Sequence, residues 1–137
     1  MSTIQLVVLA AVVLGGAAYV WGGAKRSMRA DAAFFTDLVQ RLTPILEGRG
    51  FRLTRHVHMP KSFGHRIATF EGRSFIVDAA WEGRDREILL LQRAPDQSNV
   101  SAGEHLAGAY IPQGASSEVY ARATDTIVTA AASIGAA

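Results

Sequence analysis

The chain has no cysteine among its 137 residues. This absence excludes a disulfide framework, a thiolate nucleophile and any zinc or iron–sulfur site that depends on cysteine ligands. Residues 1–24 also contain no charged side chain, although charged residues make up 19% of the whole chain. The chain therefore divides into an uncharged amino-terminal segment and a polar remainder that is long enough for one domain.

The uncharged segment has the length and composition of a transmembrane helix. Residues 4–21 read IQLVVLAAVVLGGAAYVW, and three more small residues extend the run to residue 24. At about 1.5 Å per residue, some twenty helical residues span the roughly 30 Å hydrocarbon core of a bilayer. Aromatic and basic side chains then mark the membrane interface; they are Tyr19, Trp21, Lys25, Arg26 and Arg29. We predict a transmembrane anchor over residues 1–24 and a basic juxtamembrane collar over residues 25–29.

A cleaved secretory signal is the alternative interpretation of this segment. Such a signal needs basic residues before its apolar core, whereas residues 1–5 carry none and the positive cluster follows the run. We therefore predict a retained anchor. The positive-inside rule places the collar in the cytoplasm. The expected location is the inner (cytoplasmic) membrane, with a single pass, the amino terminus outside and residues 30–137 forming a cytoplasmic domain.

Small residues recur along one side of the predicted anchor. Their spacings of four, three and four place them on one helix face, where a second transmembrane helix can approach closely. They are Ala11, Gly15, Ala18 and Gly22. General abundance of small residues is the alternative explanation, since the chain has 13 glycines. The helix-packing interpretation predicts other integral membrane proteins as partners.

Residues 30–137 show the periodicities of an α+β domain. Apolar residues three and four apart predict an amphipathic helix over residues 30–48, in which Pro44 implies a kink or an early end near Thr43. A second helix is predicted over residues 116–134, with Ser116 or Ser117 as its cap. Four strands are expected between the helices, over residues 51–58, 66–70, 74–81 and 86–92.

Short connections between these strands favour antiparallel neighbours. The predicted fold is thus a two-layer α+β domain that consists of a helix, a four-stranded antiparallel meander and a carboxy-terminal helix. Residues 94–114 are interpreted as a long loop with one short element near residues 105–111. In the first strand, simple alternation places Leu53, Arg55 and Val57 on one face and His56 and His58 on the other.

No motif in the chain predicts catalysis, a cofactor or a metal ion. The pair His56 and His58 supplies only half a metal site, and we interpret these residues as polar side chains on an edge strand. Ser62 lies near His65, but the nucleophile-elbow pattern is absent. Acidic residues from Asp78 onward surround a turn and are expected to be solvated. We therefore predict no catalytic, cofactor-binding or metal-binding residue.

Positive charge is concentrated between residues 41 and 73, which contain seven Lys or Arg side chains. Arginine suits bidentate contact with carboxylates, phosphates or lipid headgroups. Candidate contacts to a partner or an anion are Arg52, Arg55, Lys61 and Arg66. Anionic lipid headgroups are the expected partners of the collar. Nucleic acid is not expected, because the net charge is only +2 and no aromatic–basic RNA motif is present.

These observations favour a non-enzymatic accessory or scaffolding subunit of a larger bacterial membrane complex, such as a respiratory or photosynthetic one. This hypothesis predicts that a partner covers exposed apolar residues on the carboxy-terminal helix or on the 94–114 segment. Two alternatives stay open. A membrane-tethered sensor or ligand-binding domain predicts an apolar cavity lined by Phe70, Phe75 and Trp81. A small hydrolase predicts that Ser62, His65 and an acid converge.

Overall fold

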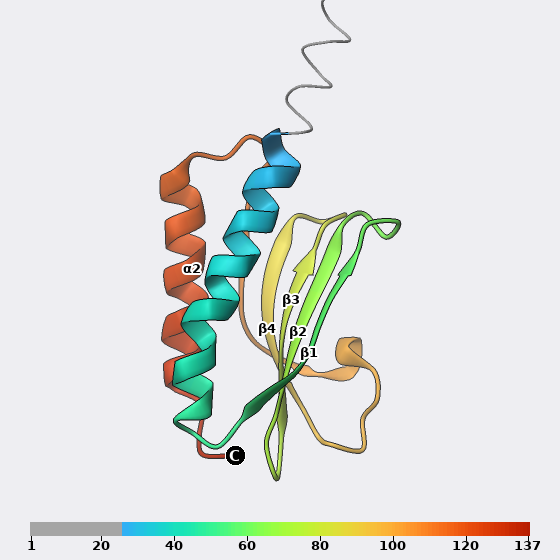
Figure 1. Ribbon diagram of the computed structural model, residues 1–137, viewed down its shortest axis with the longest axis vertical. Coiled ribbons are helices and arrows are strands. Elements are labelled where there is room, and N and C mark those ends of the chain that lie inside the picture. Colours follow the sequence, from blue (N-terminus) through green and yellow to red (C-terminus); the bar gives the residue numbers. More distant parts are fainter. Residues whose placement is uncertain (1–25) are drawn as a thin grey trace, which may run out of the picture.

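The computed structural model describes residues 26–137, which form two helices and one five-stranded sheet (Figure 1). The amino-terminal helix covers residues 26–47. The elements that follow are β1 (Arg52–Met59), β2 (His65–Glu71), β3 (Ile76–Glu82), β4 (Glu87–Arg93), the short 3₁₀ helix η1 (Val100–Ala102), β5 (Glu104–Tyr110) and α2 (Ser117–Ala132). The strands pair antiparallel in the order β1-β2-β3-β4-β5, so the sheet is a simple meander.

Both helices pack on the same face of the sheet and lie side by side (Figure 1). They run in the same direction, because Asp31 contacts Tyr120 near their starts and Arg49 donates hydrogen bonds to the carbonyls of Ala132 and Ile134 near their ends. Arg49 follows the amino-terminal helix directly. Its positive charge therefore lies against the last carbonyls of α2, where the helix dipole favours a cation.

The hydrophobic core lies between the helix pair and the sheet. Strand register places Phe70 opposite Val77, and Trp81 opposite Ile88, on the face that the helices cover. Phe35, Leu38 and Leu42 recur along the buried stripe of the amino-terminal helix, which is the three-to-four spacing that the sequence shows. From α2, the core receives Ala123, Ile127 and Ala131.

The predicted number of strands was wrong, because the sheet has five strands and not four. The fifth strand, β5, lies within the segment that we expected to be a long loop. Its sequence EHLAGAY contains Ala107, Gly108 and Ala109, residues with little intrinsic preference for strands. Pairing with the buried strand β4 and packing against α2 stabilise it instead. The α+β class and the carboxy-terminal helix with Ser116 as its cap are confirmed.

Two local expectations are corrected by the structure. The amino-terminal helix continues through Pro44 to residue 47, so of the two effects expected from Pro44, a kink or an early end near Thr43, the early end does not occur. In β1, the register shifts between Leu53 and Arg55, which indicates a β-bulge. Since a bulge adds one residue to a strand whose side chains alternate, Arg55 lies on the opposite face from Leu53.

The predicted membrane anchor cannot be compared with the structure. Residues 1–25 lie outside the described part of the chain, and with them the small-residue face of the anchor and three of the five interface residues, Tyr19, Trp21 and Lys25. Within residues 26–137, neither helix has the length and apolar character that crossing a bilayer requires. Of the collar, Arg26 and Arg29 belong to the first turns of the amino-terminal helix.

Candidate functional site

One end of the domain gathers the start of the amino-terminal helix, the β1–β2 turn, the β3–β4 turn and the end of β5 (Figure 1). We call it the proximal end, because the described part of the chain begins there, at residue 26. It comprises residues 26–31, 59–66, 81–87 and 110–112. Its side chains form one buried polar cluster and one hollow that opens to the surface.

The polar cluster is centred on the carboxylate of Asp31. The Arg86 guanidinium donates two hydrogen bonds to it, at 3.0 and 2.8 Å, and the Tyr120 hydroxyl donates a third at 2.7 Å. Arg86 Nε also donates to the carbonyl of Ile111 at 2.9 Å, and its guanidinium lies 5.2 Å from the centre of the Trp81 ring. The cluster therefore joins the amino-terminal helix, the β3–β4 turn and α2.

Electrostatics within this cluster raise the pKa of both Tyr120 and Arg86. Burial raises the pKa of Tyr120 to about 12, together with its hydrogen bond to Asp31 and the negative charge of that carboxylate. Burial acts to lower the pKa of Arg86, but the hydrogen bonds and charge of Asp31 outweigh it and the pKa rises. Neither group exchanges a proton near neutral pH. The cluster is therefore suited to joining the elements around it and not to acid–base catalysis.

A hollow of about 150 Å³ lies beside the cluster. It is lined by Met28, Asp31, His58, Pro60, Phe63, Gly64, Arg66 and Trp81. Burial and the nearby positive charge of Arg66 lower the pKa of His58. His58 is therefore uncharged at neutral pH, and the cationic group on this lining is Arg66.

The β1–β2 turn projects Phe63 from this hollow into solvent. Phe63 has a φ of 57°, a left-handed conformation that is uncommon for a bulky residue. Gly83 of the β3–β4 turn packs directly against it, because a β carbon at Gly83 would lie 1.8 Å from the Phe63 carbonyl oxygen. The Arg84 guanidinium lies 5.7 Å from the centre of the Phe63 ring. Contacts with the neighbouring turn therefore hold Phe63 in place.

His65 also joins these two turns, which bears on the hydrolase alternative. Its Nε2 lies 2.9 Å from Glu82 Oε2, and its Nδ1 accepts a hydrogen bond from the Gly83 N–H at 2.9 Å. Both ring nitrogens are thus engaged. A general base needs a free nitrogen facing the nucleophile, so His65 is not arranged to activate Ser62.

The four candidate contact residues do not form one site. In the strand register, Arg52 lies opposite Glu71 at the end of the sheet away from the proximal end. Arg55 lies opposite Thr69 in the middle of β1. Lys61 and Arg66 both belong to the proximal end, where Lys61 is exposed. The β-bulge and the length of β1 separate the four side chains, and a sequence pattern cannot show either effect.

The structure separates the residues of the expected ligand pocket. Phe75 directly precedes β3 and Trp81 lies near the other end of that strand, while Phe70 is fully buried in the core. Six residues of a strand span about 20 Å, which is too far for a shared small cavity. Residues 26–137 also contain no group of three His, Asp or Glu side chains close enough to hold a metal ion.

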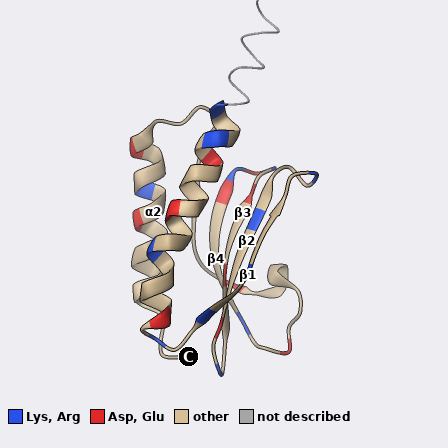
Figure 2. Cartoon of the chain, viewed as in Figure 1, with Lys and Arg blue, Asp and Glu red and all other residues tan. Residues whose placement is uncertain are grey.

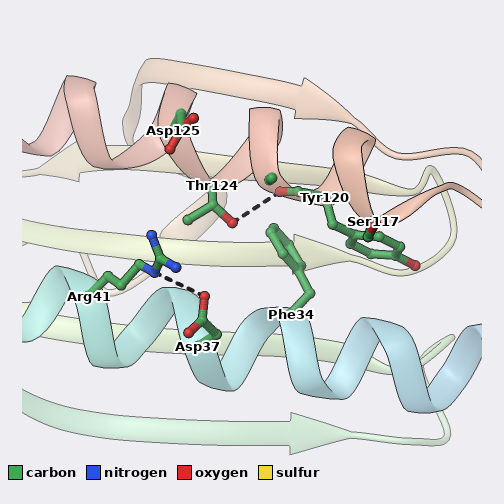
Figure 3. A pocket seen from close by; sticks show the side chains of 8 residues that line it. Phe34, Asp37, Arg41, Ser117, Tyr120, Thr124 and Asp125 are labelled. Atoms are coloured by element: carbon green, nitrogen blue, oxygen red, sulfur yellow. Dashed lines mark hydrogen bonds and ion pairs between the residues drawn. The ribbon is translucent and has the colours of Figure 1, made fainter.

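A second hollow, of about 220 Å³, lies between the two helices (Figure 3). The Asp37–Arg41 ion pair, at 3.0 Å, forms one wall, and Tyr120, Thr124 and Asp125 line the α2 side. The ion pair is exposed, and Thr124 Oγ1 donates to the carbonyl of Tyr120 at 3.0 Å. Asp37, Arg41 and Thr124 thus interact with neighbours on their own helices, and the Tyr120 hydroxyl donates to Asp31 on the other helix.

A second buried polar cluster, which the sequence patterns did not predict, lies on the sheet face away from the helices. Asp78 is fully buried, although we expected it to be solvated. Its carboxylate accepts hydrogen bonds from Thr69 Oγ1 at 2.7 Å and Arg93 Nε at 2.8 Å. Arg93 also donates to the carbonyl of Gln97, which fixes the loop that follows β4. The signal was the position of Asp78 inside an otherwise apolar strand, since an unpaired carboxylate there is costly.

Comparisons with known proteins do not assign the chain to a family. No protein-family model, no curated protein and no solved structure matches it.

Proposed function

We propose that this protein is a membrane-anchored accessory or scaffolding subunit of a larger bacterial membrane complex, with its folded domain on the cytoplasmic side. Residues 1–24 act as a single-span anchor in this proposal, and their small-residue face binds a transmembrane helix of a partner. The observation that carries the proposal is the continuous amino-terminal helix, which connects the basic collar to the domain core without a linker.

The helix connects these parts within a few residues. Arg26 and Arg29 lie in the same helix as the buried Phe34, Phe35 and Leu38. At about 1.5 Å per residue, residue 34 lies only about 12 Å along the axis from residue 26. The described helix therefore begins two residues after the uncharged segment, and it runs without a break into the core of the domain.

The polar cluster at Asp31 stiffens this connection. It joins the helix to the β3–β4 turn through Arg86 and to α2 through Tyr120. A domain held in one orientation suits a subunit that occupies a defined position in an assembly. A tethered sensor that must search for its ligand gains instead from a flexible linker.

Extraction of native membranes with a mild detergent tests the proposal. The tagged full chain is separated by native size, and the proteins that migrate with it are identified. We expect stoichiometric comigration with a large complex. A chain that migrates as a free monomer or homodimer would contradict the subunit proposal, and recovery outside the membrane fraction would contradict the anchor.

Variants of the anchor and of the helix refine this test. Gly15→Leu with Ala18→Leu should release the chain from the complex, whereas Ala17→Leu, about 200° around the helix from Gly15, should not. An insertion of four residues, composed of glycine and serine, after Arg29 should weaken comigration of the chain with the complex. Retention of the chain in the membrane should stay unchanged. The same insert in the β2–β3 turn, between Arg73 and Ser74, is the matched control. Equal behaviour of the two insertions would contradict the role of the continuous helix.

A further inference from the structure

We propose that the proximal end of the folded domain is itself a lipid-binding surface, which rests on anionic headgroups with Phe63 in the interfacial layer. This inference rests on the proposed anchor, because it places the domain at the membrane. It adds a second contact with the bilayer, made by parts of the chain that lie far from the anchor in sequence.

The exposed large apolar side chains supply the first observation. Residues 26–137 expose three of them, Met28, Phe63 and Tyr110, with exposed fractions of 64%, 67% and 63%. Met28 and Phe63 line the same hollow, and Tyr110 pairs with Glu87 beside the β3–β4 turn. All three therefore lie at the proximal end. Single exposed apolar residues are ordinary, but their restriction to one end of a domain marks an interaction surface.

Charge supplies the second observation. The segments that form this end carry five basic residues besides Arg86 (Figure 2); they are Arg26, Arg29, Lys61, Arg66 and Arg84. The acidic side chains there are Asp31, Glu82, Asp85 and Glu87, of which Asp31 is paired with Arg86 and Glu82 with His65. Exposed apolar and aromatic side chains within a basic surround are complementary to an anionic bilayer surface.

The position of the remaining chain supplies the third observation. The described part of the chain begins at the proximal end, at residue 26, and Met28 is only four residues beyond the predicted anchor. Four helical residues cover about 6 Å, and each headgroup layer is roughly 5–8 Å thick. A domain attached this closely brings Met28 to the headgroup layer. Phe63 lines the same hollow as Met28 and is therefore close to the headgroup layer in this proposal.

The conformation of the β1–β2 turn explains how Phe63 is presented. The left-handed backbone at Phe63 and the close approach of Gly83 hold the aromatic ring outward. Arg84 lies over the ring, so the aromatic group and a cation are presented together. A turn held in this way orders few additional groups when it binds, which lowers the entropic cost of docking.

The absence of native cysteine allows a direct test with single-cysteine labels. Ser62→Cys places a fluorophore beside Phe63, and Ser74→Cys places one in the β2–β3 turn at the other end of the sheet. The full-length protein is reconstituted in vesicles that contain phosphatidylglycerol and a lipid with a shallow nitroxide quencher. We expect strong quenching at residue 62, little at residue 74, and weaker quenching at residue 62 in vesicles of phosphatidylcholine alone.

Two variants separate the apolar and the charged contributions. Phe63→Asn removes the aromatic ring, and asparagine tolerates the left-handed backbone at this position. The variant should therefore lower quenching at residue 62. Lys61→Gln with Arg84→Gln removes two cations, each of which strengthens binding to an anionic surface by roughly fivefold. The paired variant should thus weaken domain docking by about thirtyfold. Arg73→Gln at the other end is the matched control, and circular dichroism verifies the fold of each variant.

The outcomes distinguish this inference from the proposed function. Equal quenching at residues 62 and 74 in protein that floats with the vesicles would overturn lipid docking and leave the anchor intact. Protein that does not float would overturn the anchor and the docking surface together. A label at residue 62 that is shielded in native membranes but not quenched in lipid vesicles would overturn lipid docking in favour of a protein partner.

Discussion

Asp31 and Asp78 each accept hydrogen bonds from one arginine and one hydroxyl group, but they join parts of the chain that differ greatly in sequence separation. Asp78 binds Thr69 and Arg93, which lie on the neighbouring strands of the meander. Asp31 binds Arg86 and Tyr120, which are 55 and 89 residues away. The first cluster joins neighbouring strands and a loop, whereas the second joins both helices to the β3–β4 turn.

The two clusters also differ in exposure to solvent. The Asp78 and Arg93 side chains are 0% and 8% exposed, whereas those of Asp31 and Arg86 are 10% and 18% exposed. When one partner of a buried ion pair is removed, the other charge stays buried without a counter-charge. The free-energy penalty is larger where solvent has less access to that charge. Burial therefore predicts a larger thermodynamic effect at Asp78, while topology predicts a larger structural effect at Asp31.

The largest expected effect is that of Asp78→Ala. It leaves the Arg93 guanidinium buried without its carboxylate, and we expect a loss of about 3–5 kcal/mol in the free energy of unfolding. Urea unfolding of the full chain in a mild detergent, followed by circular dichroism, measures it. The double variant Asp78→Ala with Arg93→Met should recover much of that loss. A loss of less than about 1 kcal/mol in the free energy of unfolding would contradict the expectation that the Arg93 guanidinium stays buried without a counter-charge.

A smaller loss, about 2 kcal/mol, is expected for Asp31→Ala, because Arg86 retains the Ile111 carbonyl and some contact with water. Its structural effect should be broader. Amide hydrogen exchange should accelerate in the amino-terminal helix and at the start of α2, whereas Asp78→Ala should accelerate exchange mainly in the loop after β4. Exchange that rises in the same segments for both variants would break the contrast between local and global fastening.

The smallest expected effect is that of Tyr120→Phe, about 1 kcal/mol at neutral pH, because it removes one hydrogen bond to a carboxylate that keeps Arg86. Its pH dependence is more informative. Tyrosine ionises near pH 10 in the unfolded chain, and its pKa is about 12 in the fold. The folded state thus retains the proton more tightly, and the stability that Tyr120 contributes decreases as pH rises from 10 to about 12.

In the Tyr120→Phe variant, this part of the decrease in stability with rising pH should be absent. Unfolding curves of the wild type and the variant should converge as pH rises through this range. Thr69→Val, which removes the matching hydroxyl of the other cluster, should leave the high-pH decline unchanged. Parallel curves for the wild type and Tyr120→Phe would show that Tyr120 ionises as it does in the unfolded chain.

Local patterns predicted most helices and strands well. The apolar spacing of Phe35, Leu38 and Leu42 and the cap at Ser116 are short-range signals, and the structure confirms the elements they predict. The fifth strand was missed because its residues prefer other conformations and only pairing with β4 selects a strand. The bulge in β1 was missed for a related reason, since a register shift depends on the partner strand.

The candidate site was less predictable than the fold. Lys61 and Arg66 were selected by charge, and they do lie at the proximal end. The exposed Phe63 was not selected, because its exposure depends on a left-handed turn held by Gly83. No local signal in the sequence relates Phe63 to Gly83, because the two residues belong to different turns.

The sequence by itself determined the uncharged segment of residues 1–24, the adjoining collar and the α+β class, because composition and apolar periodicity are properties of neighbouring residues. Only the tertiary structure decided which charges are buried and which apolar side chains stay exposed. Asp31 accepts a hydrogen bond from Tyr120, and Met28 lines the same hollow as Phe63, across long stretches of chain. Such contacts arise when the helices pack on the sheet, and the spacing of residues along the chain carries no record of them.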